Sequence, residues 1–215
     1  MTARTKATPS LAIIDALDRL AAQIRKNHPE VPENIVFVLA SGRSGRGAKH
    51  GHFAPGAWTE DHHEILISAE SLARGAEATL GTLIHELGHA VAAATGVRDT
   101  SNNGRYHNKR FKTIAEALGI TLEQHDTIGW SLTTLPPETA AKYATGLALL
   151  EKSITTYRRG GGAEAGPAPK KPRNKTKAPM VCGCEDEVTV SIQWFERQGE
   201  GLFCSLCEQG YVLVA

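Results

Sequence analysis

The stretch GTLIHELGHA, from Gly81 to Ala90, places three ionisable side chains in the middle of an otherwise apolar helical pattern. Apolar residues recur there at three- and four-residue spacing, which predicts one buried stripe. They are Leu80, Leu83, Ile84, Leu87, Val91 and Ala94, and Gly96 follows as a natural C-terminal cap. Burial of His85, Glu86 and His89 on such a helix is costly unless something compensates their charge or polarity. A divalent cation is the obvious compensation.

The spacing of these side chains suits a metal centre. Residues four apart lie on one face of a helix, so His85 and His89 can direct their imidazoles at one point. Glu86 projects about 100° around the helix, so it is placed to act as a general base rather than as a ligand. Zinc is the expected ion because it accepts imidazole nitrogen and can leave one position open to water. The competing interpretation is a pair of packed histidines, each satisfied by a carbonyl group.

A catalytic zinc needs a third protein ligand, and the sequence offers three candidates. His107 is favoured because it follows a polar Asn/Gly loop and begins a predicted helix that can face the first one. Glu116, on that following helix, and His125 are the alternatives. The metzincin pattern, which continues the first helix to a glycine and a third histidine, is excluded because Ala92 and Thr95 occupy those positions.

All four cysteines lie near the C-terminus in two close pairs. The pairs are Cys182 with Cys184 and Cys204 with Cys207. In a reducing compartment they favour a closed four-thiolate zinc site, which would stabilise a module too small to be stable on its core alone. Disulfides in a secreted tail and unliganded thiols are the competing interpretations. The N-terminal residues lack an apolar signal segment, and no run approaches the roughly 20 apolar residues of a membrane span. We therefore expect a cytoplasmic protein with no membrane partner.

The remaining patterns predict an α+β domain, a linker and a small module. Helical periodicity covers 11–25, the segment from 71 to the cap at 96, 109–120 and 138–157. β-Branched runs predict a strand over 34–40 and a hairpin of 50–58 with 62–70, in a sheet expected to be antiparallel. After residue 158 the sequence becomes rich in Gly, Pro and Lys, a composition that cannot bury a core. The predicted organisation is a domain over 1–158, a flexible basic linker over 159–179 and a four-cysteine module over 180–215.

Together these features resemble the SprT-like zinc metalloproteases. The resemblance is carried by HELGHA, an 18-residue step from His89 to the sequence HNKRF, the preceding strand EILIS and the four-cysteine module. It implies a zincin-like metalloprotease domain with a small antiparallel sheet and an HExxH helix, followed by a structural zinc ribbon. It also implies one catalytic zinc on His85, His89 and His107, with Glu86 as the catalytic acid/base, and one structural zinc on the four cysteines.

The chain departs from the family pattern at two positions. Asn108 follows the third histidine, where the family often has glycine. The first cysteine pair is Cys182-x-Cys184, with a gap of one residue instead of the usual two. Neither departure removes a ligand, but the shorter gap requires a tighter turn to bring both sulfurs to one zinc.

The resemblance further implies a protein substrate and an association with DNA, because better-studied relatives look like proteases that degrade proteins trapped on DNA. A net charge of +1 gives no global field for nucleic acid, but basic residues cluster in two places. These are Arg158, Arg159, Lys170, Lys171, Arg173, Lys175 and Lys177 in the linker, and Arg98, Arg105, Lys109, Arg110 and Lys112 around the third histidine. Each cluster either binds nucleic acid without sequence preference or is simply a solvent-exposed charged segment with no binding role. The ribbon is acidic, and the loop SGRSGRGAKHGH lacks the ending of a P-loop, so no nucleotide site is expected.

These observations predict a zinc-dependent endopeptidase. A substrate strand is expected to pair with the sheet near residues 64–68, and Glu86 is expected to move the proton. Tyr106 or His63 is expected to stabilise the oxyanion. One alternative is a regulatory metallopeptidase that cuts a single repressor. The other is a non-proteolytic, nucleic-acid-associated adaptor in which both zinc ions are structural.

Overall fold

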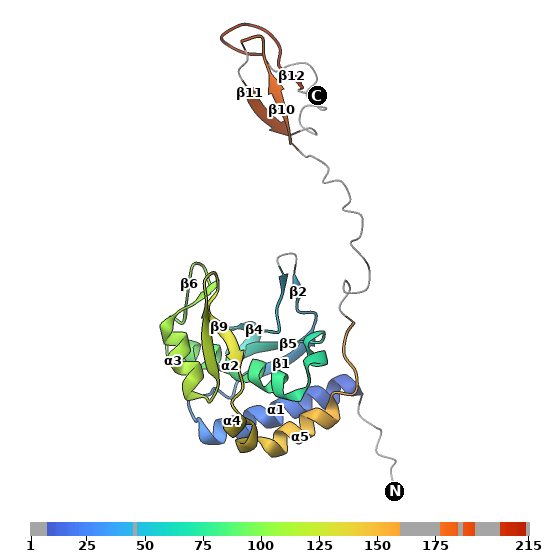
Figure 1. Ribbon diagram of the computed structural model, residues 1–215, viewed down its shortest axis with the longest axis vertical. Helices are drawn as coiled ribbons and strands as arrows, with labels where there is room; N and C mark the ends of the chain where they lie inside the picture. Colours follow the sequence, from blue (N-terminus) through green and yellow to red (C-terminus); the bar gives the residue numbers. More distant parts are fainter. Residues whose placement is uncertain (1–7, 45–46, 160–176, 185–186, 192–202, 214–215) are drawn as a thin grey trace. The chain divides into compact units, whose positions relative to one another are not determined.

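The computed structural model describes residues 8–44, 47–159, 177–184, 187–191 and 203–213. The chain forms two compact units, Met1–Gly160 and Gly161–Ala215 (Figure 1). Most of the predicted linker, 160–176, lies outside the described residues. Within the described part of the chain, no helix is long and apolar enough to cross a membrane.

The first unit contains a three-stranded mixed sheet. Its order is β1 (Ile35–Ala40), β5 (His63–Ser68), β4 (Gly51–Ala54). β4 and β5 form the predicted antiparallel hairpin, but β1 pairs with β5 in parallel, with Phe37 opposite Ile65. The expectation of an antiparallel sheet is therefore wrong. After β1 the chain first forms β4 at the outer edge, and β5 then enters between β1 and β4. A short apolar run in the sequence does not specify this strand order.

The same order corrects the expected substrate edge. Because β5 is the central strand, residues 64–68 are paired on both sides and cannot accept a further strand. The edge strand is β4.

Before β4, the chain forms a small hairpin of β2 (Arg43–Ser44) and β3 (Gly47–Ala48), and a 3-10 turn, η1 (Thr59–Asp61), links β4 to β5.

Helices supply most of the core around this sheet. α1 packs along α5 and against β1, and α2 packs against β4, β5 and α3 (Figure 1). The bounds are α1 (Pro9–Asn27), η2 (Ser71–Arg74), α2 (Ala76–Ala94), α3 (Lys109–Ala117), α4 (Pro137–Lys142) and α5 (Ala144–Ser153). Side chains that are at most 1% exposed join these elements, among them Ile13, Leu17, Leu20, Ile24, Ile65, Ile67, Leu80, Leu83, Ile84 and Leu87. The stripe predicted on the central helix is thus buried from Leu80 to Val91, whereas Ala94 at its end is exposed.

Two helix predictions need adjustment. The segment from 71 begins with the separate turn η2, because Gly75 adopts a φ of +87° that interrupts the helix before α2 starts. The single helix expected over 138–157 is divided into α4 and α5 at Tyr143, whose φ of −108° and ψ of 21° are not helical. The Tyr143 ring is buried, so packing in the core accompanies this break.

A second, four-stranded sheet follows α2 and was not predicted. Its order is β6 (Thr100–Ser101), β7 (Tyr106–His107), β9 (Gly129–Thr134), β8 (Thr121–His125). β8 and β9 form an antiparallel hairpin, and β7 meets β9 in parallel where His107 pairs with Gly129. A side chain at Gly129 would lie 2.1 Å from the His107 carbonyl oxygen, so only glycine permits this approach. The sheet thereby fixes the position of His107.

The second unit is a small antiparallel sheet beside the cysteines. β10 (Lys177–Val181) lies between β11 (Glu187–Ser191) and β12 (Val212–Leu213), and Phe203 forms an isolated bridge with Gly210. Residues 192–202, between the two cysteine pairs, lie outside the described residues.

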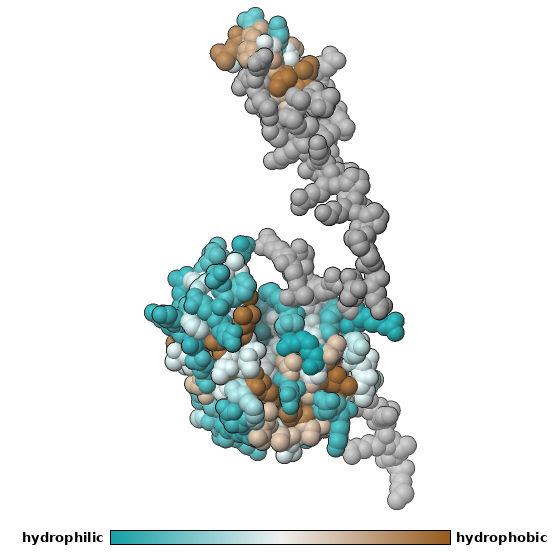
Figure 2. Space-filling model, viewed as in Figure 1, coloured by the Kyte–Doolittle hydropathy of each residue, from teal (hydrophilic) through white to brown (hydrophobic). Residues whose placement is uncertain are grey.

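The surface of the first unit is mainly hydrophilic on the face shown in Figure 2. A few large apolar side chains are nevertheless exposed, including Ile128 at 41% and Leu132 at 45%. Both of these border the cleft that contains His85. The cleft therefore offers apolar contacts as well as polar ones.

Glu70 fastens the start of the β2–β3 hairpin to the sheet. Its carboxylate accepts hydrogen bonds from Ser41 Oγ at 2.7 Å, Gly42 N at 3.1 Å and Ser68 Oγ at 3.0 Å. The bond from Ser41 is the main cause that lowers the Glu70 pKa from 4.5 to about 2, against the opposing effect of burial. Three donors around one carboxylate stabilise its ionised form.

Replacing Glu70 with glutamine is expected to reduce the pH dependence of folding stability. Because the folded-state pKa lies below the unfolded value, ionised Glu70 stabilises the fold above about pH 4.5, and this contribution is lost as the pH falls toward about 2. Urea unfolding followed by circular dichroism between these pH values should show a shallower loss of unfolding free energy in Glu70→Gln than in the wild type. Identical slopes for the two proteins would contradict the role given to Glu70.

Candidate metal centre

Three imidazoles from two elements meet at one point. His85 and His89 lie one turn apart on α2, and His107 lies on β7. The Nε2 atom of His107 is 3.4 Å from Nε2 of His85 and 3.1 Å from Nε2 of His89. One ligand atom from each of the three residues lies within 4.8 Å of the others. The structure thus brings together the three histidines that the sequence favoured; Glu116 and His125 do not belong to this cluster.

Each imidazole is held from outside through its Nδ1 atom. Nδ1 of His107 bonds the Ile128 carbonyl oxygen at 3.1 Å, and Nδ1 of His89 bonds the Asp99 carboxylate at 2.5 Å. Nδ1 of His85 bonds the hydroxyl of Thr133 at 2.9 Å.

These outer contacts fix the direction of the ring nitrogens. A carbonyl or carboxylate oxygen can only accept, so the facing Nδ1 carries the proton and the neutral ring presents a lone pair at Nε2. This applies directly to His89 and His107, and the Thr133 hydroxyl can play the same part for His85. Three converging lone pairs suit a cation, and hydrogen-bonded imidazoles are the usual arrangement at zinc sites. The residues present therefore fit a zinc ion.

Electrostatics favour neutral rings at this point. Burial lowers the pKa of His85 well below its usual value, and the nearby His89 and His107 lower it further. The His107 pKa is also lowered, first by burial and then by His89. For Asp99, burial raises the pKa, but the hydrogen bond and charge of His89 outweigh this and leave it lowered. Neutral His85 and His107 rings beside an ionised Asp99 are protonation states that favour metal binding.

A phenylalanine forms the apolar floor beneath the three rings. Phe111, on α3, is fully buried. Its ring centroid lies 4.3 Å from that of His89, 4.7 Å from that of His85 and 4.8 Å from that of His107. Contact with all three rings restricts their rotation and keeps water away from one side of the cluster.

Glu86 lies beside the cluster but is not part of it. Its side chain is buried, with 6% exposed, and burial raises its pKa to about 7, against the opposing effects of His89, Lys49 and the Phe53 amide. A Cβ at Gly51 would lie 2.6 Å from Glu86 Oε1, so the backbone of β4 passes directly against this carboxylate. The helix thus presents a carboxylate that exchanges a proton near neutral pH next to the three imidazoles.

The cluster opens into a large cleft between the two sheets. α2, β4 and β9 contribute to its walls, and His85, Glu86, His89 and His107 all line it. Neither of the predicted oxyanion residues belongs to the described lining. The Tyr106 hydroxyl instead accepts from Gln124 Nε2 at 2.8 Å, and His63 Nδ1 accepts from the Gly56 amide at 3.0 Å. Polar side chains that do line the cleft on the β4 side are Lys49, His50 and His52.

The four cysteines form a second cluster in the other unit. The Sγ atom of Cys184 lies 3.1 Å from that of Cys182 and 3.6 Å from that of Cys204, and all four sulfurs, including Cys207, lie within 4.8 Å of one another. No disulfide joins them. The one-residue gap in the first pair therefore does not keep its sulfurs apart. Backbone amides of Cys207 and Leu206 lower the Cys204 pKa to about 6, which favours the thiolate form that binds metal.

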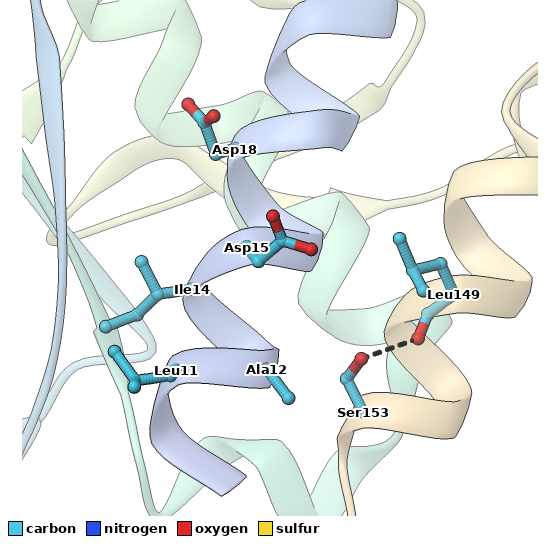
Figure 3. A pocket seen from close by; sticks show the side chains of 7 residues that line it. All are labelled: Leu11, Ala12, Ile14, Asp15, Asp18, Leu149 and Ser153. Atoms are coloured by element: carbon cyan, nitrogen blue, oxygen red, sulfur yellow. Dashed lines mark hydrogen bonds between the residues drawn. The ribbon is translucent and has the colours of Figure 1, made fainter. Parts of the chain in front are cut away.

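A shallow pocket between α1 and α5 contrasts with these clusters. Figure 3 shows Leu11, Ala12, Ile14, Asp15 and Asp18 on α1, with Leu149 and Ser153 on α5. The Ser153 hydroxyl donates to the Leu149 carbonyl at 2.8 Å, and Asp15 accepts from Arg19 at 2.8 Å. The pocket has no imidazole or thiol and so offers no comparable chemistry.

The sequence did not reveal the groups that hold the ligands from outside. Asp99 had one usable signal, since a carboxylate ten residues after a metal-binding histidine is a fair partner for its Nδ1 atom. Thr133, Ile128 and Phe111 had none, because the first two lie on or beside the unpredicted strand β9 and the third looks like any helix core residue.

No family model, curated protein or solved structure gives a significant match to this chain.

Proposed function

We propose that the chain is a zinc-dependent endopeptidase, with His85, His89 and His107 as the zinc ligands and Glu86 as the general acid/base. The observation that carries this proposal is the convergence of three Nε2 atoms beside a buried glutamate in an open cleft. The resemblance to SprT-like metalloproteases, which includes the zincin-like domain and the ribbon, supports the same assignment. The Cys182, Cys184, Cys204 and Cys207 cluster would hold a second, structural zinc.

Glu86 does the proton transfer in this reaction. When bound, zinc would supply a Lewis acid and lower the pKa of water in the site. The Glu86 carboxylate accepts a proton from the attacking water as its oxygen bonds to the peptide carbonyl carbon. The same carboxyl group then gives this proton to the amide nitrogen as the C–N bond breaks, which leaves a carboxylic acid and an amine. Its pKa of about 7 suits both transfers.

The edge strand β4 is the proposed docking site for the substrate. The His50 carbonyl oxygen, just before β4, accepts from the Ser68 amide, so alternation along an antiparallel pair turns the backbone groups of Gly51 and Phe53 away from β5. The Phe53 amide faces the Glu86 carboxylate, so an extended polypeptide can pair with the Gly51 backbone and the Phe53 carbonyl while its carbonyl carbon lies near Glu86. Among the described residues no strand pairs with this side of β4.

Lys49 and His52 replace Tyr106 and His63 as the proposed partners of the carbonyl oxygen. Both line the cleft. The charge of Lys49 lowers the pKa of Glu86, of His107 and of His52, groups that come from three separate elements. A cation with this reach can stabilise negative charge that develops on the carbonyl oxygen.

The wild-type protein provides the first test. Metal analysis should find two zinc ions per chain, and an unfolded substrate such as casein should be cut in a way that 1,10-phenanthroline stops and added zinc restores. If both ions are present but casein and a peptide library remain uncut, the adaptor alternative is favoured. If no zinc is found at the histidines, the proposal fails.

DNA association is a second proposal, supported by cationic side chains in and around the cleft. Lys49, Arg74 and Arg105 line it. Lys112 is already engaged, with its ammonium 4.0 Å from the Trp130 ring centroid and 3.6 Å from Glu116. Single-stranded DNA should bind in a salt-dependent manner. Cleavage that DNA accelerates would favour a protease acting on DNA-bound proteins, whereas cleavage that DNA leaves unchanged would favour the regulatory peptidase.

A further inference from the structure

The residue after the third histidine connects two parts of the metal centre. Asn108 is the N-cap of α3: its Oδ1 accepts from the Arg110 amide at 2.8 Å and from the Phe111 amide at 3.2 Å. In the opposite direction its Nδ2 donates to the Arg98 carbonyl at 2.8 Å, and its backbone amide donates to the Asp99 carbonyl at 3.0 Å. One side chain thus joins the start of α3 to the loop that follows α2.

Both ends of this connection contact zinc ligands. On the loop side, the Asp99 carboxylate holds Nδ1 of His89. On the helix side, the capped first turn presents the Phe111 ring to all three imidazoles, and His107 is the immediate neighbour of Asn108. The separation between His89 and His107 therefore depends on how this loop and this helix are joined.

Glycine at this position could not make these contacts. Without a side chain it has neither an oxygen to cap α3 nor an amide to bond Arg98, so only backbone bonds, to the Asp99 carbonyl and from the Lys112 amide, would survive. The carboxamide supplies one acceptor and one donor in fixed relation, and both are used. The side chain therefore links two segments of the chain in addition to capping the helix.

We propose that Asn108 is a positioning residue for the zinc site: by bonding Arg98 and capping α3, it sets the distance between His89 and His107 and thereby the affinity for zinc. The inference rests on the proposed zinc site but not on peptidase activity. Partners that orient metal ligands contribute about 10- to 100-fold in affinity. Loss of the bond to Arg98 should fall within this range.

Asn108→Ser is the main test, because serine still caps a helix but is too short to reach the Arg98 carbonyl. Asn34→Ser is the matched control, since Asn34 Nδ2 also joins two loops, by donating to the Asp61 carbonyl at 2.7 Å, but far from the histidines in sequence. Competition with a chromophoric chelator measures zinc affinity, the absorption of the cobalt-substituted protein reports the ligand geometry, and urea unfolding of the metal-free proteins measures stability. Asn108→Ser should bind zinc about 10-fold more weakly and show an altered cobalt spectrum, whereas Asn34→Ser should match the wild type in both.

Asn108→Asp separates lost positioning from lost folding. Aspartate keeps the cap and removes the donor, and its negative charge would by itself strengthen cation binding. A fall in zinc affinity in this variant would therefore follow from the changed contact with Arg98, where a donor is lost and a carboxylate faces the carbonyl oxygen, and not from a lost cap. An unaltered cobalt spectrum in folded Asn108→Asp, or zinc affinity within twofold of that of the wild type in folded Asn108→Ser, overturns the inference. If the wild type itself binds no zinc at the histidines, the proposed function fails first.

Discussion

Glu86→Gln is expected to abolish peptide cleavage while the protein keeps its zinc. Glutamine has nearly the same shape as glutamate, but it cannot accept the proton of the attacking water or return one to the leaving amine. Loss of a general acid/base typically costs about 10²- to 10⁴-fold in rate, and here one group serves both transfers. The three imidazoles and their outer partners are unchanged, so zinc content should stay the same. The initial rate of casein cleavage and metal analysis of the same preparation measure the two quantities.

Glu77→Gln is the matched control for this experiment. Glu77 lies on the same helix and lines the same cleft, but it is in the first turn of α2, away from the imidazoles in sequence. The control variant should cleave at the wild-type rate within about twofold. Cleavage by Glu86→Gln at a rate similar to that of the control would remove Glu86 from the mechanism, even if the zinc site itself were established.

His107→Ala is expected to release zinc from the histidine site. This variant removes one of three Nε2 atoms and leaves α2, with the other two, intact. Outer partners alone contribute about 10- to 100-fold in metal affinity, so loss of a direct ligand should weaken zinc binding by more than about 100-fold and stop cleavage. The cysteine site lies in the other unit and should keep its ion. Zinc content should therefore fall from two ions per chain to one.

The two rejected ligands provide the controls. Glu116→Gln and His125→Ala change the residues that the sequence offered as alternatives, and neither residue joins the cluster. The Glu116 carboxylate lies 3.6 Å from the ammonium of Lys112, and His125 Nδ1 accepts from the Thr127 amide at 3.2 Å, so both have other contacts. Both variants should retain two zinc ions. Loss of the ion in either of them, together with its retention in His107→Ala, would reverse the ligand assignment.

Local spacing explains why the sequence predicted the ligands so directly. On a helix, two residues four apart must share a face, so His85 and His89 converge whatever surrounds them. Glu86, next in the chain, must then point elsewhere. The paired cysteines follow the same logic, because short gaps leave little freedom. His107 was less constrained: its choice over Glu116 and His125 depended on an assumed reversal of the chain, which β6 and β7 provide.

The order and direction of the strands depended on contacts between distant segments. The apolar runs at β1 and β5 were visible, but nothing local states that they pair in parallel with β4 on the outer side. The second sheet was missed because β8 and β9 are half polar and their residues have little strand periodicity. The unknown strand order had a functional consequence, because residues 64–68 of the central strand β5 were expected to be the substrate edge instead of β4.

The sequence by itself therefore determined the helices, apart from the breaks at Gly75 and Tyr143, together with the reactive residue types and the pairs of ligands that lie within one turn of each other. These features depend on neighbours along the chain. Only the tertiary structure decided which groups surround them. Asp99, Thr133 and the Ile128 carbonyl hold the imidazoles, Phe111 lies beneath them and Asn108 joins the two segments that carry them. These groups are brought together by packing and hydrogen bonds between segments up to 48 residues apart. Contacts between such distant segments produce no periodic pattern in the sequence.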